Sequence, residues 1–208
     1  MNKTLEHLIL LYATGDSIAL HKHMDGLSKD ILATTLVDLL ALYMNDKNSS
    51  SLRELITVRL AGYELSEGKL GYNGYRLAAP DSAPFFCEAK PVNVTRLEDG
   101  RPNRKLNGGG NFSDYTPERL DEDLKKNPQM LVSGFVDGRL AYIIEFPFRC
   151  LEARLRVVLE KHFPGGNRPP NQYLRSASFT FKDYQDCPDL RLVHRAENLD
   201  DFKDSLSE

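Results

Sequence analysis

Apolar side chains recur at helical spacing along the first part of the chain. The segments 3–14, 28–45 and 52–63 each repeat them three and four positions apart, which is the period of one helix face. Ser50 or Ser51 can cap the third of these helices. Helix faces this wide normally pack on a sheet or on another helix, so we expect helices beside a core. In the second segment, one stripe is formed by Leu32, Leu36, Leu39, Leu40 and Tyr43.

The pattern changes to short apolar runs and turns after residue 68. Residues 69–77 and 85–94 are typical of two strands around a turn that contains two prolines. Residues 130–136 and 139–146 flank an Asp-Gly turn and predict a second hairpin. The segment 95–111 between them is rich in Arg, Asn and Gly without periodicity, which is typical of functional or disordered loops.

The remaining elements complete the predicted fold. Thr116 caps a short helix that runs to Lys126. A helix over 150–162, strands over 173–181 and 190–194, and a terminal helix over 199–206 follow. This order predicts a mixed α/β (α+β) fold in which helices flank a central mixed sheet. We expect one domain over 1–208, with a helical N-terminal region (1–48), a core (50–148), and a helix and late strands that complete the sheet (149–208).

Composition and charge fit a globular protein. The 208 residues are 41% hydrophobic and 27% charged, with a net charge of −3. No apolar run approaches the roughly 20 residues that cross a bilayer, and the apolar stretch 8–13 lacks the flanks of a signal peptide. The total charge excludes a globally basic nucleic-acid coat, but it allows a local basic face.

The three cysteines are Cys87, Cys150 and Cys187. They are far apart and odd in number, which argues against a disulfide framework or a zinc site. We therefore expect free thiols and a cytoplasmic protein.

An acid and a lysine stand two positions apart in the second predicted strand. Alternate residues of a strand share a face, so Glu88 and Lys90 project together, with Phe86 on the same side. A carboxylate can hold Mg²⁺, which activates a water for phosphodiester hydrolysis, and a nearby lysine can stabilise the developing charge. The pair therefore suits a metal-dependent nuclease.

In these residues the chain resembles the PD-(D/E)XK nuclease superfamily, and type II restriction endonucleases in particular. Glu88-Ala89-Lys90 matches the (D/E)-X-K half of the motif. The resemblance covers residues 50–148 and implies a restriction-endonuclease-like core, Mg²⁺ (for which Mn²⁺ can substitute), double-stranded DNA as substrate and a homodimer that uses the N-terminal helices.

The first acid of the motif has two candidate positions. Asn73, fifteen residues before Glu88, occupies the place where the resemblance implies a metal-binding Asp. Pro80-Asp81 spells the literal motif, but it lies in the predicted turn. Three interpretations stay open: Asn73 replaces an Asp, Asp81 supplies the ligand instead, or the chain is a weakened relative. Members of the superfamily often add a Glu from the preceding helix, and here Glu54 is the candidate, with Glu64 and Glu67 as competitors.

The segment after Lys90 suits contact with DNA. Basic side chains match phosphates and guanine edges, and Asn matches adenine edges. The candidate DNA-binding residues are Arg96, Arg101, Arg104, Lys105, Asn107 and Asn111. A second candidate strip, on charge alone, is formed by Arg168, Arg175 and Lys182.

Three further polar residues are assigned to the surface. Glu145 lies in an apolar strand, and we expect it to face solvent at a sheet edge. His21 and His23 have no third ligand near them in the sequence, which favours solvent exposure at a helix end over a metal site.

These features predict a Mg²⁺-dependent type II restriction endonuclease. A structure-selective nuclease of the resolvase or repair type and a DNA-binding relative without catalysis are the alternatives.

Overall fold

The computed structural model describes residues 2–45, 50–66, 71–79, 82–93, 108–136 and 139–196. The helices are α1 Lys3–Ala13, α2 Ser17–Asp25, α3 Lys29–Asn45, α4 Ser51–Leu60, α5 Pro117–Lys126 and α6 Glu152–His162. The strands are β1 Glu64–Leu65, β2 Gly74–Arg76, β3 Phe85–Asn93, β4 Gly110–Tyr115, β5 Gln129–Val136, β6 Arg139–Pro147, β7 Leu174–Phe179 and β8 Arg191–Arg195. Short 3-10 turns cover Phe148–Leu151, Pro164–Gly166 and Phe181–Asp183. The predicted terminal helix over 199–206 lies outside the described residues.

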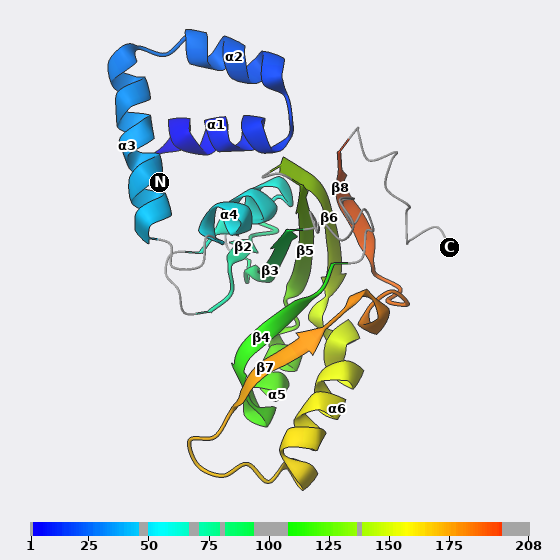
Figure 1. Ribbon diagram of the computed structural model, residues 1–208. Helices are drawn as coiled ribbons and strands as arrows, with labels where there is room; N and C mark the ends of the chain where they lie inside the picture. Colours follow the sequence, from blue (N-terminus) through cyan, green and yellow to red (C-terminus); the bar gives the residue numbers. More distant parts are fainter. Residues whose placement is uncertain are drawn as a thin grey trace, which may run out of the picture.

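The protein is a mixed α/β fold with a central mixed sheet of six strands flanked by helices, as predicted (Figure 1). The strand order is β1-β2-β3-β5-β6-β8. Both predicted hairpins are present as antiparallel pairs, β2 with β3 and β5 with β6. Between them β3 and β5 run parallel, because the connection through β4 and α5 returns the chain to the same end of the sheet.

The two faces of the sheet carry two separate cores. Because side chains alternate, Cys87 and Ala89 of β3 join Leu131 and Ile143 in a core shared with α4 and α1. The opposite face packs Met130, Val132, Ile144 and Phe146 against α6 and against β4 and β7. Glu88 and Lys90 therefore lie on this second face of β3. Burial on the first face raises the pKa of the Cys87 thiol to about 12.

β4 and β7 form a separate two-stranded antiparallel sheet. The predicted late strand over 173–181 corresponds to β7, which pairs with β4. The other late strand corresponds to β8, which alone extends the central sheet beside β6. The prediction that both late strands complete the sheet is therefore wrong for β7. β4 itself was not predicted. Its start is rich in glycine, and the left-handed backbone of Asp114 (φ 52°) interrupts the alternation of inward and outward side chains by which a strand is predicted.

The helical N-terminal region is confirmed, with one helix more than predicted. Asp16 begins α2 by accepting a hydrogen bond from the Ala19 amide at 2.8 Å. None of the residues of α2 is fully buried, so the apolar period that reveals helices in sequences is weak there. His21 is exposed, but His23 packs edge-on against His7 with 4.5 Å between ring centroids, so its predicted solvent exposure is wrong.

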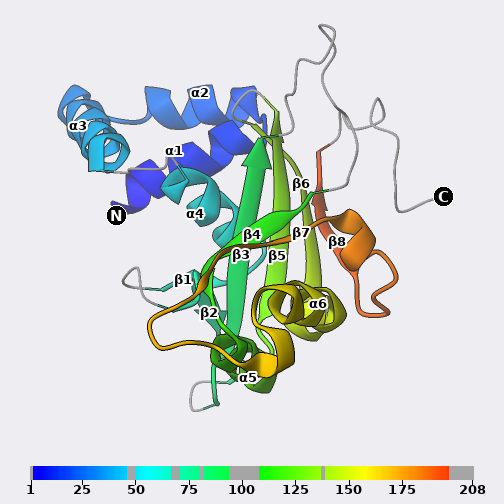
Figure 2. The same ribbon diagram turned by 60° about the horizontal axis from the view of Figure 1, so that its bottom comes forward.

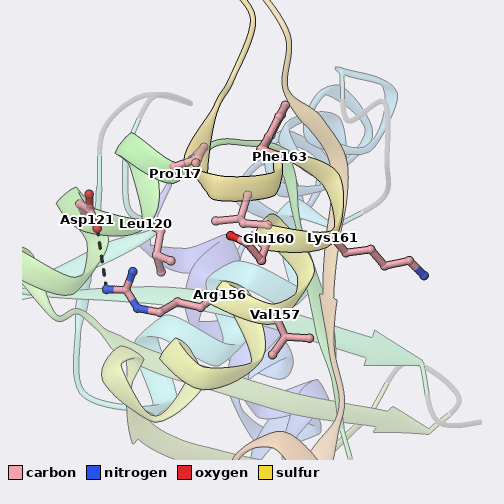
Figure 3. A pocket seen from close by; sticks show the side chains of 10 residues that line it. Pro117, Leu120, Asp121, Arg156, Val157, Glu160, Lys161 and Phe163 are labelled. Atoms are coloured by element: carbon pink, nitrogen blue, oxygen red, sulfur yellow. Dashed lines mark ion pairs between the residues drawn. The ribbon is translucent and has the colours of Figure 1, made fainter.

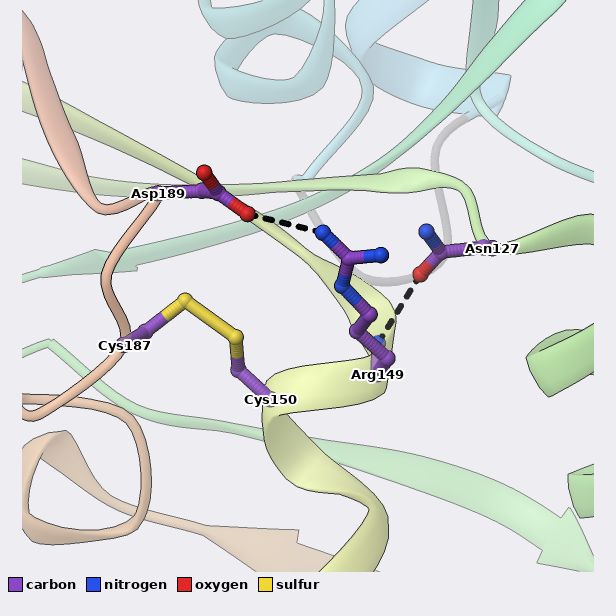
Figure 4. Close-up of a disulfide and its surroundings, with 5 residues drawn as sticks. All are labelled: Asn127, Arg149, Cys150, Cys187 and Asp189. Carbon is purple, nitrogen blue, oxygen red and sulfur yellow. Dashed lines mark hydrogen bonds and ion pairs between the residues drawn. A yellow bond between two sulfur atoms is a disulfide. The ribbon is translucent and has the colours of Figure 1, made fainter.

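Two of the three cysteines form a disulfide, which corrects the expectation of free thiols. Cys150, in the 3-10 turn that precedes α6, is bonded to Cys187, in the segment before β8, with 5.8 Å between their Cα atoms (Figure 4). Arg149 and Asp189 make an ion pair of 2.8 Å beside it. The bond joins the segment before β8 to the turn before α6, and the sequence separation of 37 positions concealed the pairing.

Glu145 is buried, and the expectation that it faces solvent is wrong. β8 covers β6, so β6 is an interior strand and the Glu145 side chain is 1% exposed. Its carboxylate accepts a hydrogen bond from the Tyr63 hydroxyl at 2.7 Å and one from Arg191 Nη2 at 2.7 Å. These two donors satisfy the buried charge.

No helix in the described part of the chain is both long and apolar enough to cross a bilayer.

Candidate functional site

Glu88 and Lys90 lie side by side on one face of β3, as the alternation predicts. Lys90 Nζ is 2.7 Å from Glu88 Oε1, and the side chains are 19% and 12% exposed respectively. The pair is therefore largely removed from water but open on one side. The ion pair thus places one carboxylate and one ammonium group together at a partly exposed position.

Strand β4 covers the lysine. The Phe112 ring centroid is 4.8 Å from Lys90 Nζ, which is a cation–π contact. A Cβ placed on Gly110 would lie 2.9 Å from Lys90 Cγ, so only glycine allows β4 to approach this closely. These contacts fix the aliphatic stem of Lys90 and leave its charged end beside Glu88.

Asn73 lies next to Glu88 across the β2–β3 pair. Gly74 is opposite Cys87, which places Asn73 opposite Glu88 just before β2 begins. Asn73 Oδ1 accepts a hydrogen bond from the Ala89 amide at 2.8 Å. That amide belongs to the peptide between Glu88 and Ala89, so the side chain of residue 73 is connected directly to the strand that carries the acid and the lysine.

The third acid candidate, Glu54, is brought to the same place by α4. Asn73 Nδ2 donates to Glu54 Oε2 at 3.2 Å. Gly74 allows α4 to pack close to the start of β2, because a Cβ at position 74 would lie 2.6 Å from Val58 of α4. This close packing brings Glu54 within reach of Asn73. The structure therefore joins Glu54, Asn73 and the Glu88-Ala89-Lys90 segment in one cluster, which we call the Asn73 cluster.

Of the two competitors of Glu54, the described one, Glu64, does not belong to the Asn73 cluster. Glu64 lies on β1 and pairs with Arg59, and its side chain is 64% exposed. Glu67 and Asp81 lie outside the described residues, so the interpretation in which Asp81 is a ligand stays a prediction.

The predicted DNA-binding segment is described only at its end. Arg96, Arg101, Arg104, Lys105 and Asn107 lie outside the described residues. Asn111 is exposed on β4 and its Nδ2 donates to Ser176 Oγ of β7 at 3.3 Å.

The buried carboxylate of Asp123, which the sequence analysis did not single out, holds two tyrosines next to the Asn73 cluster. Asp123 of α5 is 7% exposed and accepts hydrogen bonds from the hydroxyls of Tyr72, at 2.8 Å, and Tyr115, at 2.9 Å. Burial, together with the Asp123 charge, raises the pKa of both tyrosines. Tyr72 precedes Asn73 and packs on Phe86, so this network positions the strand end that carries Asn73. The available signal was an acid on the same helix face as Leu120 and Leu124.

The Asn73 cluster contains two carboxylates and one carboxamide, with Glu54 on the α4 side of the sheet and Glu88 on the opposite face of β3. Within the described residues, no three His, Cys, Asp or Glu side chains converge in a way that would hold a metal ion. Carboxylate and amide oxygens are the donors that Mg²⁺ accepts, so Glu54, Asn73 and Glu88 fit it by chemical type. An Asp at position 73 would complete a set of three carboxylates.

A cavity between α5 and α6 does not offer the same chemistry. It has a volume of about 680 Å³ and is lined by residues that include Leu120, Val157 and Phe163 (Figure 3). Its guanidinium, Arg156, already pairs with Glu152 at 2.8 Å and with Asp121 at 3.9 Å. These acids neutralise the cation, which makes the cavity a poor phosphate site.

No protein-family model matches this chain, and no curated protein matches it.

Proposed function

We propose that this chain is a Mg²⁺-dependent endonuclease of the PD-(D/E)XK kind that hydrolyses double-stranded DNA with the sequence specificity of a type II restriction enzyme. The observation that supports this most is the Asn73 side chain, which contacts both the Glu54 carboxylate and the peptide after Glu88. Glu54 and Asn73 are thereby connected to the backbone of the strand that carries the acid–lysine pair. A solvated E-X-K strand face would need no such convergence.

Each residue of the Asn73 cluster has a distinct role in this proposal. Glu54 and Glu88 supply oxygen ligands for the metal, and position 73 supplies the ligand between them. When bound, Mg²⁺ lowers the pKa of a coordinated water and neutralises charge that develops on the phosphate. Lys90 orients the attacking water or stabilises the charge on the scissile phosphate, since its ammonium lies beside Glu88.

Asn73→Asp is expected to increase Mg²⁺-dependent cleavage of plasmid DNA about 100-fold. The 3.2 Å contact between residue 73 and Glu54 becomes a contact between two carboxylates, which repel each other unless a cation binds. Nicking and linearisation of supercoiled DNA measure the rate. Asn167→Asp, which makes the same change at an exposed loop position, is the matched control.

The outcome also separates the open interpretations of the motif. If Asp81→Ala abolishes cleavage while Asn73→Asp has no effect, Asp81 is the ligand. Absence of cleavage from every variant, on linear, plasmid and branched DNA alike, would contradict the nuclease proposal.

A DNA-binding relative without catalysis is the second candidate, and Asn73 is the observation that favours it. Both polar atoms of its carboxamide are engaged, Oδ1 by the Ala89 amide and Nδ2 by Glu54. In addition, Lys90 neutralises Glu88 in the absence of metal. This candidate predicts sequence-specific binding without cleavage, even when Asp stands at position 73.

The N-terminal helices supply the surface for the proposed homodimer. Most of the exposed large apolar side chains in the described residues gather there, and exposed apolar area on this scale marks an interface. Leu36, Leu40 and Tyr43 of α3 are 56%, 50% and 60% exposed and repeat every three to four residues, which suits pairing with a helix of a second copy. Two copies would provide one site for each strand of the duplex. The exposed set is Tyr12, Ile18, Met24, Ile31, Leu36, Val37, Leu40 and Tyr43.

The double variant Leu36→Glu, Leu40→Glu is expected to weaken self-association at least about 100-fold, because dimerisation would bury two unpaired charges. Sedimentation velocity over a concentration series measures the effect, and circular dichroism checks that α3 still folds. Val157→Glu places the same charge on an exposed apolar position of α6 and should leave the association unchanged. A wild-type protein that sediments as a monomer at tens of micromolar would refute this interface.

A further inference from the structure

The two-stranded sheet of β4 and β7 has one buried and one polar face. Phe112 and Ala177 are opposite each other and point into the core. The neighbouring pairs point outward, namely Asn111 with Ser178 and Ser113 with Ser176, and all four residues are exposed. We call this pair of strands the polar ribbon. Figure 2 shows it crossing in front of β3 and β5.

The outward face of the polar ribbon consists only of short hydrogen-bonding side chains. Asn111 donates to Ser176 at 3.3 Å, and Ser176 and Ser178 are 3.3 Å apart. These contacts are long and exposed to water, so the groups can exchange them for other partners at little cost. Such a face is typical of a surface that reads hydrogen-bond donors and acceptors.

A guanidinium group lies along each edge of the polar ribbon. Arg119 Nη1 donates to the Ser113 carbonyl of β4 at 3.0 Å, and Arg154 Nε donates to the Ser178 carbonyl of β7 at 3.0 Å. A carbonyl that binds outside the ladder points away from the partner strand, so the two arginines are on opposite edges. Their side chains are 44% and 38% exposed, and each guanidinium also has an acid nearby, Asp123 at 3.8 Å from Arg119 and Asp183 at 3.9 Å from Arg154.

One more cation lies on the polar ribbon itself. Arg175 of β7 is exposed and makes no ion pair with another described residue. Asp114 is the single acid of the two strands. The polar ribbon and its edges therefore carry three arginines, and Arg119 and Arg154 each have an acid partner at 3.8–3.9 Å.

We propose that the polar ribbon enters the major groove of double-stranded DNA and supplies sequence specificity, an inference that rests on the proposed nuclease function. Two strands about 4.8 Å apart fit a groove about 12 Å wide. Arg119 and Arg154 then face the phosphates on either side of the groove, and Arg175 adds a third phosphate contact. Asn111, Ser176 and Ser178 face the base edges, where Asn matches adenine and Ser matches either partner of a pair.

The polar ribbon also connects recognition to the Asn73 cluster. Its strand β4 begins at Gly110, which packs on the Lys90 stem. A duplex that binds the polar ribbon is therefore held next to the strand that carries the acid–lysine pair.

Arg175→Glu tests the proposal, because Arg175 is exposed and makes no ion pair with another described residue. Fluorescence anisotropy with a labelled random-sequence duplex, in EDTA to prevent cleavage, should show affinity about tenfold weaker and a salt slope smaller by about 1. Lys161→Glu, the same charge reversal on an exposed position of α6, should change the affinity less than twofold. Methylation of guanine N7, which blocks the major groove, should weaken wild-type binding to a selected sequence.

A second variant separates reading of bases from binding of phosphates. Asn111→Ala with Ser178→Ala should change the sequences that the protein selects from a random duplex library, with little change in affinity for random DNA. Wild-type affinity in Arg175→Glu, or insensitivity to N7 methylation, would overturn the role of the polar ribbon and leave the nuclease proposal standing. A wild-type protein that binds no duplex DNA would instead overturn the nuclease proposal itself, and preference for single-stranded nucleic acid would overturn the groove geometry.

Discussion

Lys90→Met, introduced together with Asn73→Asp, is expected to lower the rate of DNA cleavage about 100- to 1,000-fold while the protein still binds Mn²⁺. Methionine keeps the length and packing of the lysine stem against Phe112 and Gly110, but it removes the ammonium that lies 2.7 Å from Glu88. The proposed metal ligands are unchanged, and the Lys90 ammonium no longer competes with the metal ion for the Glu88 carboxylate. Single-turnover cleavage of a short duplex and calorimetric titration with Mn²⁺ measure the two effects separately.

The matched control is Lys161→Met. Lys161 is exposed on α6, so its loss should change neither cleavage nor metal binding. Cleavage by the Lys90→Met protein at the rate of its parent would mean that Lys90 neutralises Glu88 for stability alone.

Glu145→Ala is expected to lower the free energy of unfolding by about 2–4 kcal/mol. The change leaves the buried Tyr63 hydroxyl without its 2.7 Å acceptor and opens a cavity in the interior strand β6. Arg191 is 57% exposed and can return to water, so its lost ion pair adds little. Urea unfolding followed by circular dichroism measures the difference.

Two further variants test the cause of this destabilisation. Glu145→Gln retains an acceptor for Tyr63 and should lose about 1 kcal/mol. Glu122→Ala removes a carboxylate that is 63% exposed and should be nearly neutral. Equal stability of Glu145→Ala and the wild type would show that the Tyr63–Glu145 contact does not stabilise the fold.

The elements that the sequence predicted well are those with local signals. The Asp-Gly dipeptide of the sequence predicted the β5–β6 hairpin, and Thr116 with Pro117 predicted the start of α5, where the Thr116 hydroxyl accepts from the Arg119 amide. Strict alternation along β3 correctly placed Glu88 and Lys90 on one face. None of these predictions required knowledge of a distant part of the chain.

The errors concern contacts between distant segments. Glu145 looked like an edge residue because strand order is not written in the sequence, and only β8 makes β6 interior. The Cys150–Cys187 bond depends on a Cα separation of 5.8 Å that 37 residues of spacing conceal. β4 and β7 were missed as a pair for the same reason, since neither strand shows its partner.

The candidate site shows both cases. Asn73 was selected by its distance from Glu88 along the chain, and Glu54 by its place on the preceding helix. That Asn73 contacts Glu54 and the Ala89 amide together is a three-dimensional fact, which depends on the absence of a side chain at Gly74. The Asp123 network beneath it was hidden because an acid on a helix usually faces water.

Calorimetric titration of Mn²⁺ into the protein bound to duplex DNA tests the Asn73 cluster as a metal site most directly. We expect one cation for each copy, bound at least about tenfold more tightly by Asn73→Asp than by the wild type, and no binding by Glu88→Gln. Binding that Glu88→Gln leaves intact, or no binding even with Asp at position 73, would contradict it.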